Sequence, residues 1–294
     1  MNRLFSELGL QASPYKDTPP SCQMTCLGVQ INTAQMVLTV PQFRLHELHD
    51  ELSSWLTKTS CSRKDLQRLL GKLAFVTWCV RPGRAFMCRL INTLKDAPLR
   101  GRSRISIPDD VRSDLQWWMY FLRHFNGVSV IPTDIVLSNP QLFATDASLT
   151  GCGAVCFGEY FHCEFPHHIL HQCLHINRLE ILTVVAAVKT WQSKLQGLAL
   201  ELLVDNEATV HAINNQRSKD IFMQNCLREL WLCLALSNIY LRARYVEGHA
   251  NSFADALSRL HLGSEFAMRV SSIVAGQGFD QIALSDSIFH FTSF

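Results

Sequence analysis

The sequence predicts an α/β fold in which a mixed five-stranded sheet carries helices on both faces and follows a mainly α-helical segment. In the second half of the chain, three adjacent strand-like runs precede alternating helical and strand-like runs, an order typical of a mixed sheet covered by helices. In the first half, leucines recur every three or four residues, as they do in helices. Of the 294 residues, 48% are hydrophobic, which is enough for a sizeable core.

The elements of the first half follow from local patterns. Two short strands are expected around a polar turn, and a helical pattern then begins. Ser62, with Asp65 three residues later, is a helix start, Pro82-Gly83 is a break, and Pro108 opens a further helix. The expected elements are strands over 25–31 and 36–40, helices within 44–94, and a helix over 109–125.

In the second half of the chain, hydrophobic patterns typical of strands alternate with patterns typical of helices. Strands are expected over 142–145, 151–157, 160–165, 198–204 and 239–246, and helices over 177–196, 207–214, 221–236 and 252–260. The segment after Gly263 has no strong period and is expected to be a loosely attached tail.

Composition excludes several classes of function. The formal net charge of +2 is close to neutral, so any affinity for nucleic acid must come from local patches. No apolar run is long enough to span a bilayer, and the N-terminus lacks a signal-peptide pattern. The eleven cysteines are therefore interpreted as reduced thiols. We expect an intracellular protein without a membrane partner, and the sequence does not distinguish nucleus from cytoplasm.

Four acids of the second half stand where an element begins or ends: Asp146, Glu180, Asp205 and Asp255. Each has an ordinary structural explanation. Asp146 could form an Asx-turn, Asp205 could cap a helix, and Glu180 and Asp255 could close capping boxes.

Taken together, the four acids suggest a metal site. Residues just past the ends of adjacent strands lie beside one another at the sheet edge, and helix N-termini can bring further acids there. Gathered carboxylates repel unless cations neutralise them, and Mg²⁺ prefers such hard oxygen ligands. Two ions about 4 Å apart can activate a water and stabilise the leaving oxygen of a phosphodiester.

The surrounding motifs are similar to those of the ribonuclease H family. They are TDAS (145–148) with GCGA (151–154), NRLE (177–180), VDN (204–206), and GHAN (248–251) leading to ADALS (254–258). The resemblance implies a ribonuclease H-like fold and assigns Asp146, Glu180, Asp205 and Asp255 to two Mg²⁺ ions, with Mn²⁺ as a substitute. It also matches His249 to the family's mobile histidine, which assists proton movement or product release.

The residues of these motifs resemble those in the ribonuclease H domains of retrotransposon reverse transcriptases, particularly the DIRS/Ngaro-like group. Upstream, CLGV (26–29), LLGKL (69–73) and RPGRAF (81–86) resemble the end of such a polymerase and its helical connection. The resemblance divides the chain into a remnant of the palm and thumb end (1–40), a thumb- or connection-like segment (41–138), the ribonuclease H-like domain (139–262) and a C-terminal tail (263–294).

The polymerase signature Tyr-x-Asp-Asp is absent, because the one Asp-Asp pair, Asp109-Asp110, follows a proline at a helix start. We therefore expect the chain to begin downstream of a polymerase active site and to synthesise no DNA. The rest of a reverse-transcriptase polyprotein is an expected partner.

A basic stretch precedes the acids. It contacts phosphates if it faces a nucleic-acid duplex, and it is an ordinary solvated helix surface otherwise. The candidate nucleic-acid-binding residues are Arg63, Lys64, Arg68, Lys72, Arg81, Arg84 and Arg89.

Histidines and cysteines cluster between His162 and His175. Zinc sites usually show tighter paired spacing, and only His167 and His171 fit half of such a pattern, so zinc is disfavoured. Cys152 and Cys156 alternate along a strand and are expected in the core.

Two functional classes follow from these observations. The first is a metal-dependent endonuclease that hydrolyses the RNA strand of an RNA–DNA hybrid, with the hybrid preference implied by the resemblance. The alternative is a non-catalytic, nucleic-acid-binding remnant of a transposon polyprotein, which would bind with a steep salt dependence but never cleave.

Overall fold

The main sheet has six strands, one more than expected. The computed structural model describes residues 7–9, 19–98, 104–129 and 142–291. The strands are β7 (Phe143–Ala147), β8 (Gly151–Cys156), β9 (Glu159–Glu164), β10 (Ala199–Val204), β11 (Tyr240–Tyr245) and β12 (Asp280–Gln281). They lie in the order β11-β10-β7-β8-β9-β12. The predicted α/β class with a mixed sheet is confirmed, and the strand count is corrected.

Strand direction brings two of the predicted acids to one edge. β7, β8 and β9 form an antiparallel meander, whereas β10 runs parallel to both β7 and β11. Val204 of β10 is paired with Thr145 of β7, so the residues that follow each of them, Asp205 and Asp146, lie at the same level of neighbouring strands. The parallel pairing thus supplies the shared edge that the sequence predicts.

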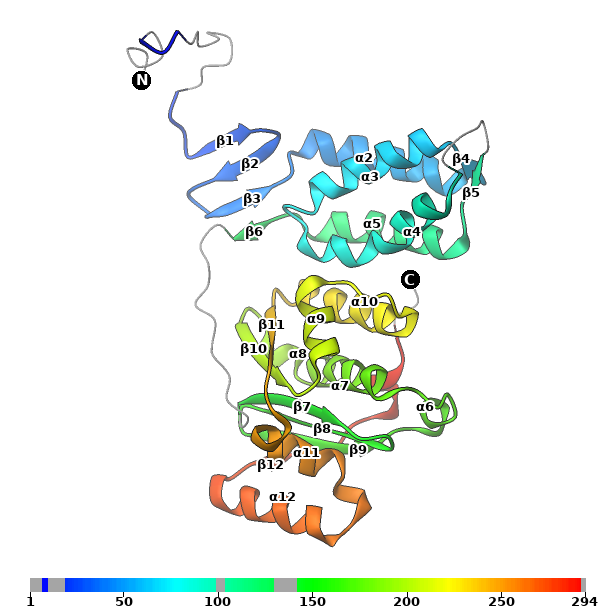
Figure 1. Ribbon diagram of the computed structural model, residues 1–294. Coiled ribbons are helices and arrows are strands. Elements are labelled where there is room, and N and C mark those ends of the chain that lie inside the picture. The colour runs from blue at the N-terminus through cyan, green and yellow to red at the C-terminus, as the bar shows by residue number, and fades with distance from the viewer. Residues whose placement is uncertain (1–6, 10–18, 99–103, 130–141, 292–294) are drawn as a thin grey trace.

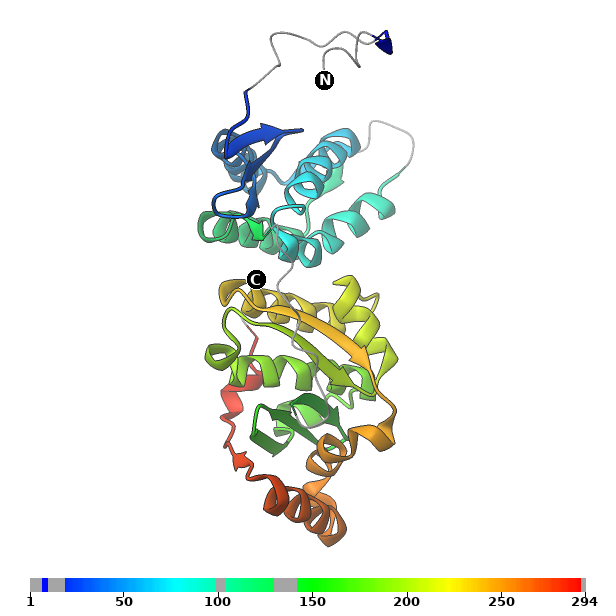
Figure 2. The same cartoon turned by 90° about the vertical axis from the view of Figure 1, so that its left-hand side faces the viewer.

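Helices cover both faces of the sheet (Figures 1 and 2). On one face lie α7 (Ile176–Thr190), α9 (Glu207–Asn215) and α10 (Ile221–Leu236), and on the other lie α11 (Ser252–Ser258) and α12 (Ser264–Gln277). α7 is buried continuously from Leu179 to Val188 because it is sandwiched between the sheet and α10. A helix that is apolar all round is expected in such a position.

The segment after Gly263 is packed rather than loosely attached. α12 lies against α11 with Val270 buried, and β12 extends the sheet by pairing in parallel with β9. Near the end of the described chain, Phe289 is also buried, and the His290 carbonyl accepts a hydrogen bond from Lys189 of α7. The two-residue strand β12 has no alternating pattern, so its pairing depends on tertiary contacts that periodicity does not reveal.

The preceding segment combines helices with a second small sheet. Its helices are α2 (Gln42–Thr57), α3 (Arg63–Val76), the 3₁₀ helix η2 (Arg81–Phe86), α4 (Cys88–Asp96) and α5 (Asp109–His124). The small sheet has the order β1-β2-β3-β6, from β1 (Gln23–Cys26), β2 (Val29–Asn32), β3 (Val37–Thr39) and β6 (Val128–Ser129). Residues 1–6, 10–18 and 130–141 of the segments predicted from the sequence lie outside the described residues.

The strand expected over 25–31 is divided into β1 and β2. Leu27 and Gly28 both have positive φ, 51° and 83°, so they form a tight hairpin turn. A leucine rarely adopts this conformation, so the sequence does not signal the turn. No helix within the described ranges is long and apolar enough to cross a membrane.

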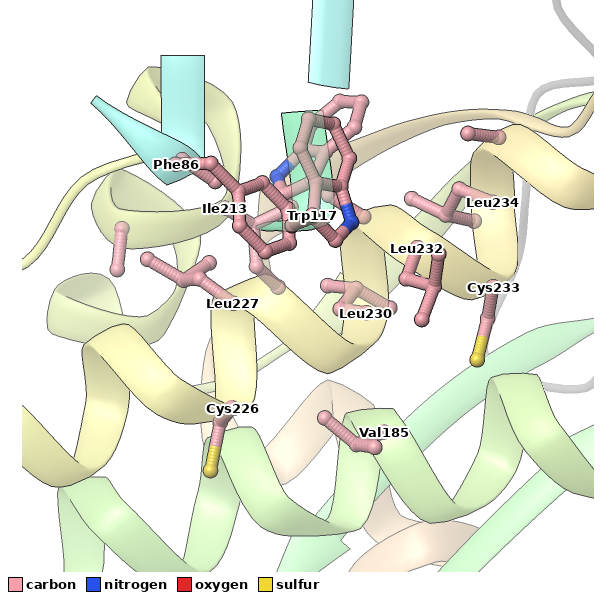
Figure 3. Close-up of a cluster of buried hydrophobic side chains, with 14 of the residues drawn as sticks. Phe86, Trp117, Val185, Ile213, Cys226, Leu227, Leu230, Leu232, Cys233 and Leu234 are labelled. Atoms are coloured by element: carbon pink, nitrogen blue, oxygen red, sulfur yellow. The ribbon is translucent and has the colours of Figure 1, made fainter. Parts of the chain in front are cut away.

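α10 joins the two halves of the molecule. One side of this helix packs on α7, and the other packs on η2 and α5 of the preceding segment. Figure 3 shows Phe86 and Trp117 above Leu227 and Leu230 of α10, with Val185 of α7 on the opposite side of the helix. The rings of Phe86 and Trp117 are stacked with centroids 3.6 Å apart. The high apolar content of α10 follows from this two-sided burial.

A buried ion pair crosses the same junction. Arg228 of α10 contacts Asp114 of α5, and the side chains are 6% and 0% exposed. Arg89 of α4 also contacts Asp114, at 3.3 Å, and the Gln224 side chain donates to the carbonyl of Ala85 at 3.0 Å. Burial raises the pKa of Asp114 to about 7 against the opposing charges of the two arginines. The junction therefore depends on ion pairs as well as on apolar contacts.

We expect Asp114→Ala to lower the free energy of unfolding by about 3–5 kcal/mol, because it leaves Arg228 buried without its carboxylate. Chemical denaturation followed by far-UV circular dichroism measures this loss. The double variant Asp114→Leu/Arg228→Met should recover most of the stability, since it removes both charges together. A single variant as stable as the wild type would contradict the buried pair.

Candidate metal centre

Three of the four predicted acids come together at the sheet edge. Asp146 lies near the end of β7, Glu180 on the second turn of α7, and Asp205 directly after β10. Their ligand oxygens all lie within 4.8 Å of one another. Asp146 and Glu180 are only 2% and 3% exposed, and Asp205 is half-buried. We call these three residues the acidic triad.

The capping roles that these acids could have had belong to other residues. The α9 N-cap is Asn206, whose side chain accepts from the backbone N–H of Thr209, so Asp205 is free of that role. The α7 N-cap is His175. Glu180 Oε1 instead accepts from the backbone N–H of Ala147 at 3.3 Å. Glu180 and Asp205 therefore do not have the capping roles considered for them, and both belong to the triad.

The triad has few internal partners for its charge. Ser258 Oγ donates to Asp146 Oδ2. Glu180 Oε2 is buried and has no hydrogen-bond partner among the described residues. Burial raises the pKa of Asp146 to about 7, and the nearby Asp205 carboxylate adds to this effect. Burial also raises the pKa of Glu180, with help from both aspartates, and burial raises the pKa of Asp205.

These features fit a divalent metal ion. The donor set consists of carboxylate oxygens, which hard cations such as Mg²⁺ prefer. One buried oxygen lacks a partner, and the proximity of the carboxylates opposes their simultaneous ionisation. A bound cation would give the buried oxygen a partner. It would also allow the neighbouring carboxylates to be ionised together. The triad could therefore hold a metal ion.

Asp255, the fourth predicted ligand, lies beside this group rather than in it. It is on the first turn of α11, and its carboxylate is paired with Arg259, four residues later. Asp255 belongs to no group of three or more potential ligands in the described chain. Its side chain is 26% exposed, unlike those of Asp146 and Glu180.

Two glycines let α11 approach the sheet closely. A Cβ at Gly153 would lie 2.4 Å from Leu257 Cβ, and one at Gly151 would lie 2.8 Å from the Ser258 carbonyl oxygen. Gly153 is also the cross-strand partner of Asp146. The hydroxyl of Ser148 donates to the Ser258 carbonyl at 2.9 Å and fixes the end of the helix. The GCGA and TDAS motifs thus position α11 as well as Asp146.

His249 lies on the loop before α11, within the 3₁₀ helix η3 (Gly248–Asn251). Its side chain is 79% exposed and lies 3.3 Å from the Glu247 carboxylate. The neighbouring Gly248 is close to the triad, because a Cβ there would lie 3.4 Å from Asp205 Oδ2. Asn251 is fully buried and donates to the carbonyl of Thr145 at 3.0 Å. The loop is therefore fixed beside β7, while its histidine is exposed to solvent.

The predicted basic residues divide into two groups. Lys64, Arg68, Lys72 and Arg84 are exposed, and the first three lie on α3 at spacings of four residues. Arg63 instead donates to the carbonyls of Leu94 and Ala97 at the end of α4, and Arg89 is engaged at the α10 junction. Only the backbone of Arg81 is described.

The histidine and cysteine cluster forms no preorganised metal site. Within the described ranges, the acidic triad is the one group of three such side chains that is close enough to share an ion. His167 and His171 are stacked on α6 (His167–Leu170) and the residue after it, and their ring centroids are 6.0 Å apart. Cys152 and Cys156 are fully buried in the core.

Sequence reasoning missed two residues of this site, Ser258 and Arg259. They follow Asp255 by three and four positions, so a helix places them on the same face as that acid. This spacing could have indicated that both residues belong to the site. It links Asp255 to Asp146 through Ser258 and gives Asp255 a cationic partner.

Comparisons with known proteins yielded likenesses to solved structures and none to curated sequences. No protein-family model matches the sequence, and no curated protein matches it. A chain from the "Structure of the foamy viral protease-reverse transcriptase in complex with dsDNA" is similar over 76% of this chain, with a TM-score of 0.31 and 14% sequence identity. This chain spans 45% of that one. The function is therefore inferred from the site itself.

The raised carboxyl pKa values predict that the metal-free protein loses stability as the pH rises. Asp146 ordinarily titrates near 3.8 and in the fold near 7, so its favourable contribution is full below about 3.8 and is lost as the pH rises through about 7. Each such group changes the unfolding free energy by at most about 1.4 kcal/mol per pH unit. Chemical denaturation in EDTA between pH 4 and pH 8 measures this slope.

Asp114 contributes in the same direction, so the decisive quantity is the difference between wild type and Asp146→Asn. The variant should lose part of the slope, and saturating Mg²⁺ should flatten the wild-type curve more than that of the variant. If the unfolding free energy changes equally with pH in both proteins in EDTA, Asp146 does not belong to a buried carboxylate cluster.

Proposed function

We propose that this protein is a metal-dependent endonuclease of the ribonuclease H type, which hydrolyses the RNA strand of an RNA–DNA hybrid. The observation that carries this proposal is the convergence of Asp146, Glu180 and Asp205 within 4.8 Å at one sheet edge. Three buried carboxylates with few partners suit cation binding and have no evident structural purpose. Mg²⁺ is the expected ion, with Mn²⁺ as a substitute.

The arrangement of the sheet supports the resemblance found in the sequence. The motifs TDAS, NRLE and VDN supply one member of the triad each, and ADALS supplies Asp255 on the adjoining helix. The antiparallel meander followed by two parallel strands matches the fold that the resemblance implies. The preference for a hybrid rests on that resemblance alone, because recognition of the 2′-hydroxyl involves contacts that no residue here identifies.

Each site residue has a proposed role. Asp146, Glu180 and Asp205 hold metal, and Asp255 completes the ligand set. Bound divalent ions would supply activation of the attacking water and neutralisation of the leaving oxygen. The Ala147 N–H orients Glu180, and Ser258 orients Asp146. His249, exposed on its loop, is suited to move a proton or to help the product leave.

The exposed basic residues of α3 are proposed to contact the substrate backbone. Lys64, Arg68 and Lys72 share one face of this helix, although Lys72 is paired with Glu51 and Arg68 lies 3.8 Å from Asp65. Contacts to phosphates position a duplex without reading its sequence. Because α10 fixes this segment against the nuclease sheet, a duplex bound on α3 would keep a constant relation to the metal centre.

The proposed biological setting is a retrotransposon reverse transcriptase, in which the rest of the polyprotein is the partner. We propose no polymerase activity for this chain. Its described part contains no Tyr-x-Asp-Asp strand pair, and the acidic triad belongs to the nuclease sheet.

Cleavage of a labelled RNA–DNA hybrid in Mg²⁺ tests the proposal. We expect fragments that carry 5′-phosphates, and we expect Asp146→Asn to lower the rate by at least about 10²-fold, since it removes one ligand charge. The matched control is Asp280→Asn, which alters an exposed aspartate on β12 and should cleave like the wild type. Circular dichroism confirms that each variant is folded.

The alternative of a non-catalytic binding remnant makes a different prediction. The protein would then bind the hybrid with a steep salt dependence but leave it intact at every Mg²⁺ and Mn²⁺ concentration. Wild-type cleavage by folded Asp146→Asn would instead show that the triad is not the active centre.

Substitutions on α3 test the proposed binding face. Lys64→Ala and Arg68→Ala should each weaken hybrid binding to a similar extent for all sequences and reduce the salt slope by about 1. Fluorescence anisotropy at several salt concentrations measures both quantities. Arg269→Ala, an exposed arginine on α12, is the control. Unchanged affinity and salt slope in both α3 variants would remove this face from the substrate path.

A further inference from the structure

We propose that Arg259 is a resident cation of the metal centre, which holds Asp255 in an ion pair and must release it before a second divalent ion binds. This inference rests on the proposed function, because it concerns the loading of the same site. It assigns to Arg259 a positioning role that neither the motifs nor the acidic triad indicates.

The first observation is the geometry of α11. Arg259 follows the last residue of this helix, and its guanidinium is paired with the Asp255 carboxylate one turn earlier. The two side chains are 34% and 26% exposed, so the pair is partly shielded from solvent. An ion pair in this position is stronger than one that is fully exposed. The fourth carboxylate is therefore already neutralised in the protein without metal.

The second observation is the position of Arg259 beside the triad. The residue before it, Ser258, donates to Asp146, and the carbonyl of Ser258 accepts from Ser148 on the loop after β7. The end of α11 is thus held against the triad, and this is where the ion pair of Arg259 with Asp255 lies.

The charges of the site then suggest an order of loading. The triad carries up to three negative charges and contains the unpartnered oxygen of Glu180, so the first divalent ion binds there. A second ion needs Asp255 and meets the positive charge of Arg259. It must displace the guanidinium and therefore binds more weakly. Because Arg259 competes with the second ion for the Asp255 carboxylate, the two ions bind with different affinities.

Binding of Mn²⁺ to the full chain, without nucleic acid, tests this proposal. Electron paramagnetic resonance counts free Mn²⁺ and gives the affinity of each ion independently of catalysis. Compared with wild type, Arg259→Gln should bind the second ion about tenfold more tightly, because a competing unit charge has been removed near its ligand. The first ion should be affected less than the second.

Two further variants serve as controls. Arg259→Lys keeps the positive charge and should retain a weak second site, which also separates the effect of charge from that of a damaged helix. Arg269→Gln removes a comparable i,i+4 pair, since Arg269 lies 2.6 Å from Glu265 on α12. This variant should bind both ions as the wild type does.

The outcomes separate this inference from the proposed function. If Arg259→Gln binds the second ion with unchanged affinity, or more weakly, Arg259 does not compete for Asp255 and the proposal is overturned. Cleavage by the wild type that disappears in Asp146→Asn would still support the nuclease function. If the wild type binds no Mn²⁺ at all, the proposed metal-dependent function fails together with the inference.

Discussion

The burial of carboxylates close to one another, with few partners, is the constraint that defines the candidate metal centre. Asp146 and Glu180 are almost inaccessible to solvent, and Asp205 is half-buried beside them. Among the described residues, this group has backbone N–H donors to Glu180 and Asp205, the hydroxyl of Ser258 and the nearby charge of Arg259. These partners are too few to compensate for the desolvation of three ionised groups. The unmet charge is what gives the site its capacity for cations.

A second buried acid in the same chain shows what a structural solution looks like. Asp114 is fully buried, and its pKa is raised to about 7, as is that of Asp146. Asp114, however, contacts two arginines, Arg228 and Arg89, from different helices. Its charge is balanced within the protein, and the balance joins α5 to α10. The shifted pKa is common to both sites, so their partners are what distinguish the ion pair from the candidate metal centre.

The junction made by α10 has a consequence for any substrate. α10 is buried on both sides because it is enclosed by α7 and by the preceding helical segment. The basic face of α3 is thereby joined to the six-stranded sheet through packed side chains and a buried ion pair. A domain interface of this kind resists independent motion of the two parts. The distance between the basic face of α3 and the acidic triad is then set by the fold.

Much of the fold could be predicted from sequence, because period and element order are local properties. The strands β7 to β11 and the helices α7, α9 and α10 lie close to their predicted ranges, and parallel pairing explains why Asp146 and Asp205 meet. The hairpin at Leu27 and the pairing of β12 were missed, since neither has a local pattern. Arg63 and Arg89 show a similar limit. A charge run does not reveal which of its members turn inward.

The short helix α11 shows how a site can be tuned without changing its ligands. Its seven residues carry Asp255 and Ser258, and Arg259 follows them. The helix lies against the sheet because Gly151 and Gly153 have no side chains and because Ser148 holds its end. Any shift of α11 therefore moves the bond to Asp146 and the ion pair of Asp255 together. The acidic triad is fixed by the sheet and by α7, whereas the charge around it depends on α11. A change in α11 can therefore alter the capacity of the site for cations while the three carboxylates stay the same.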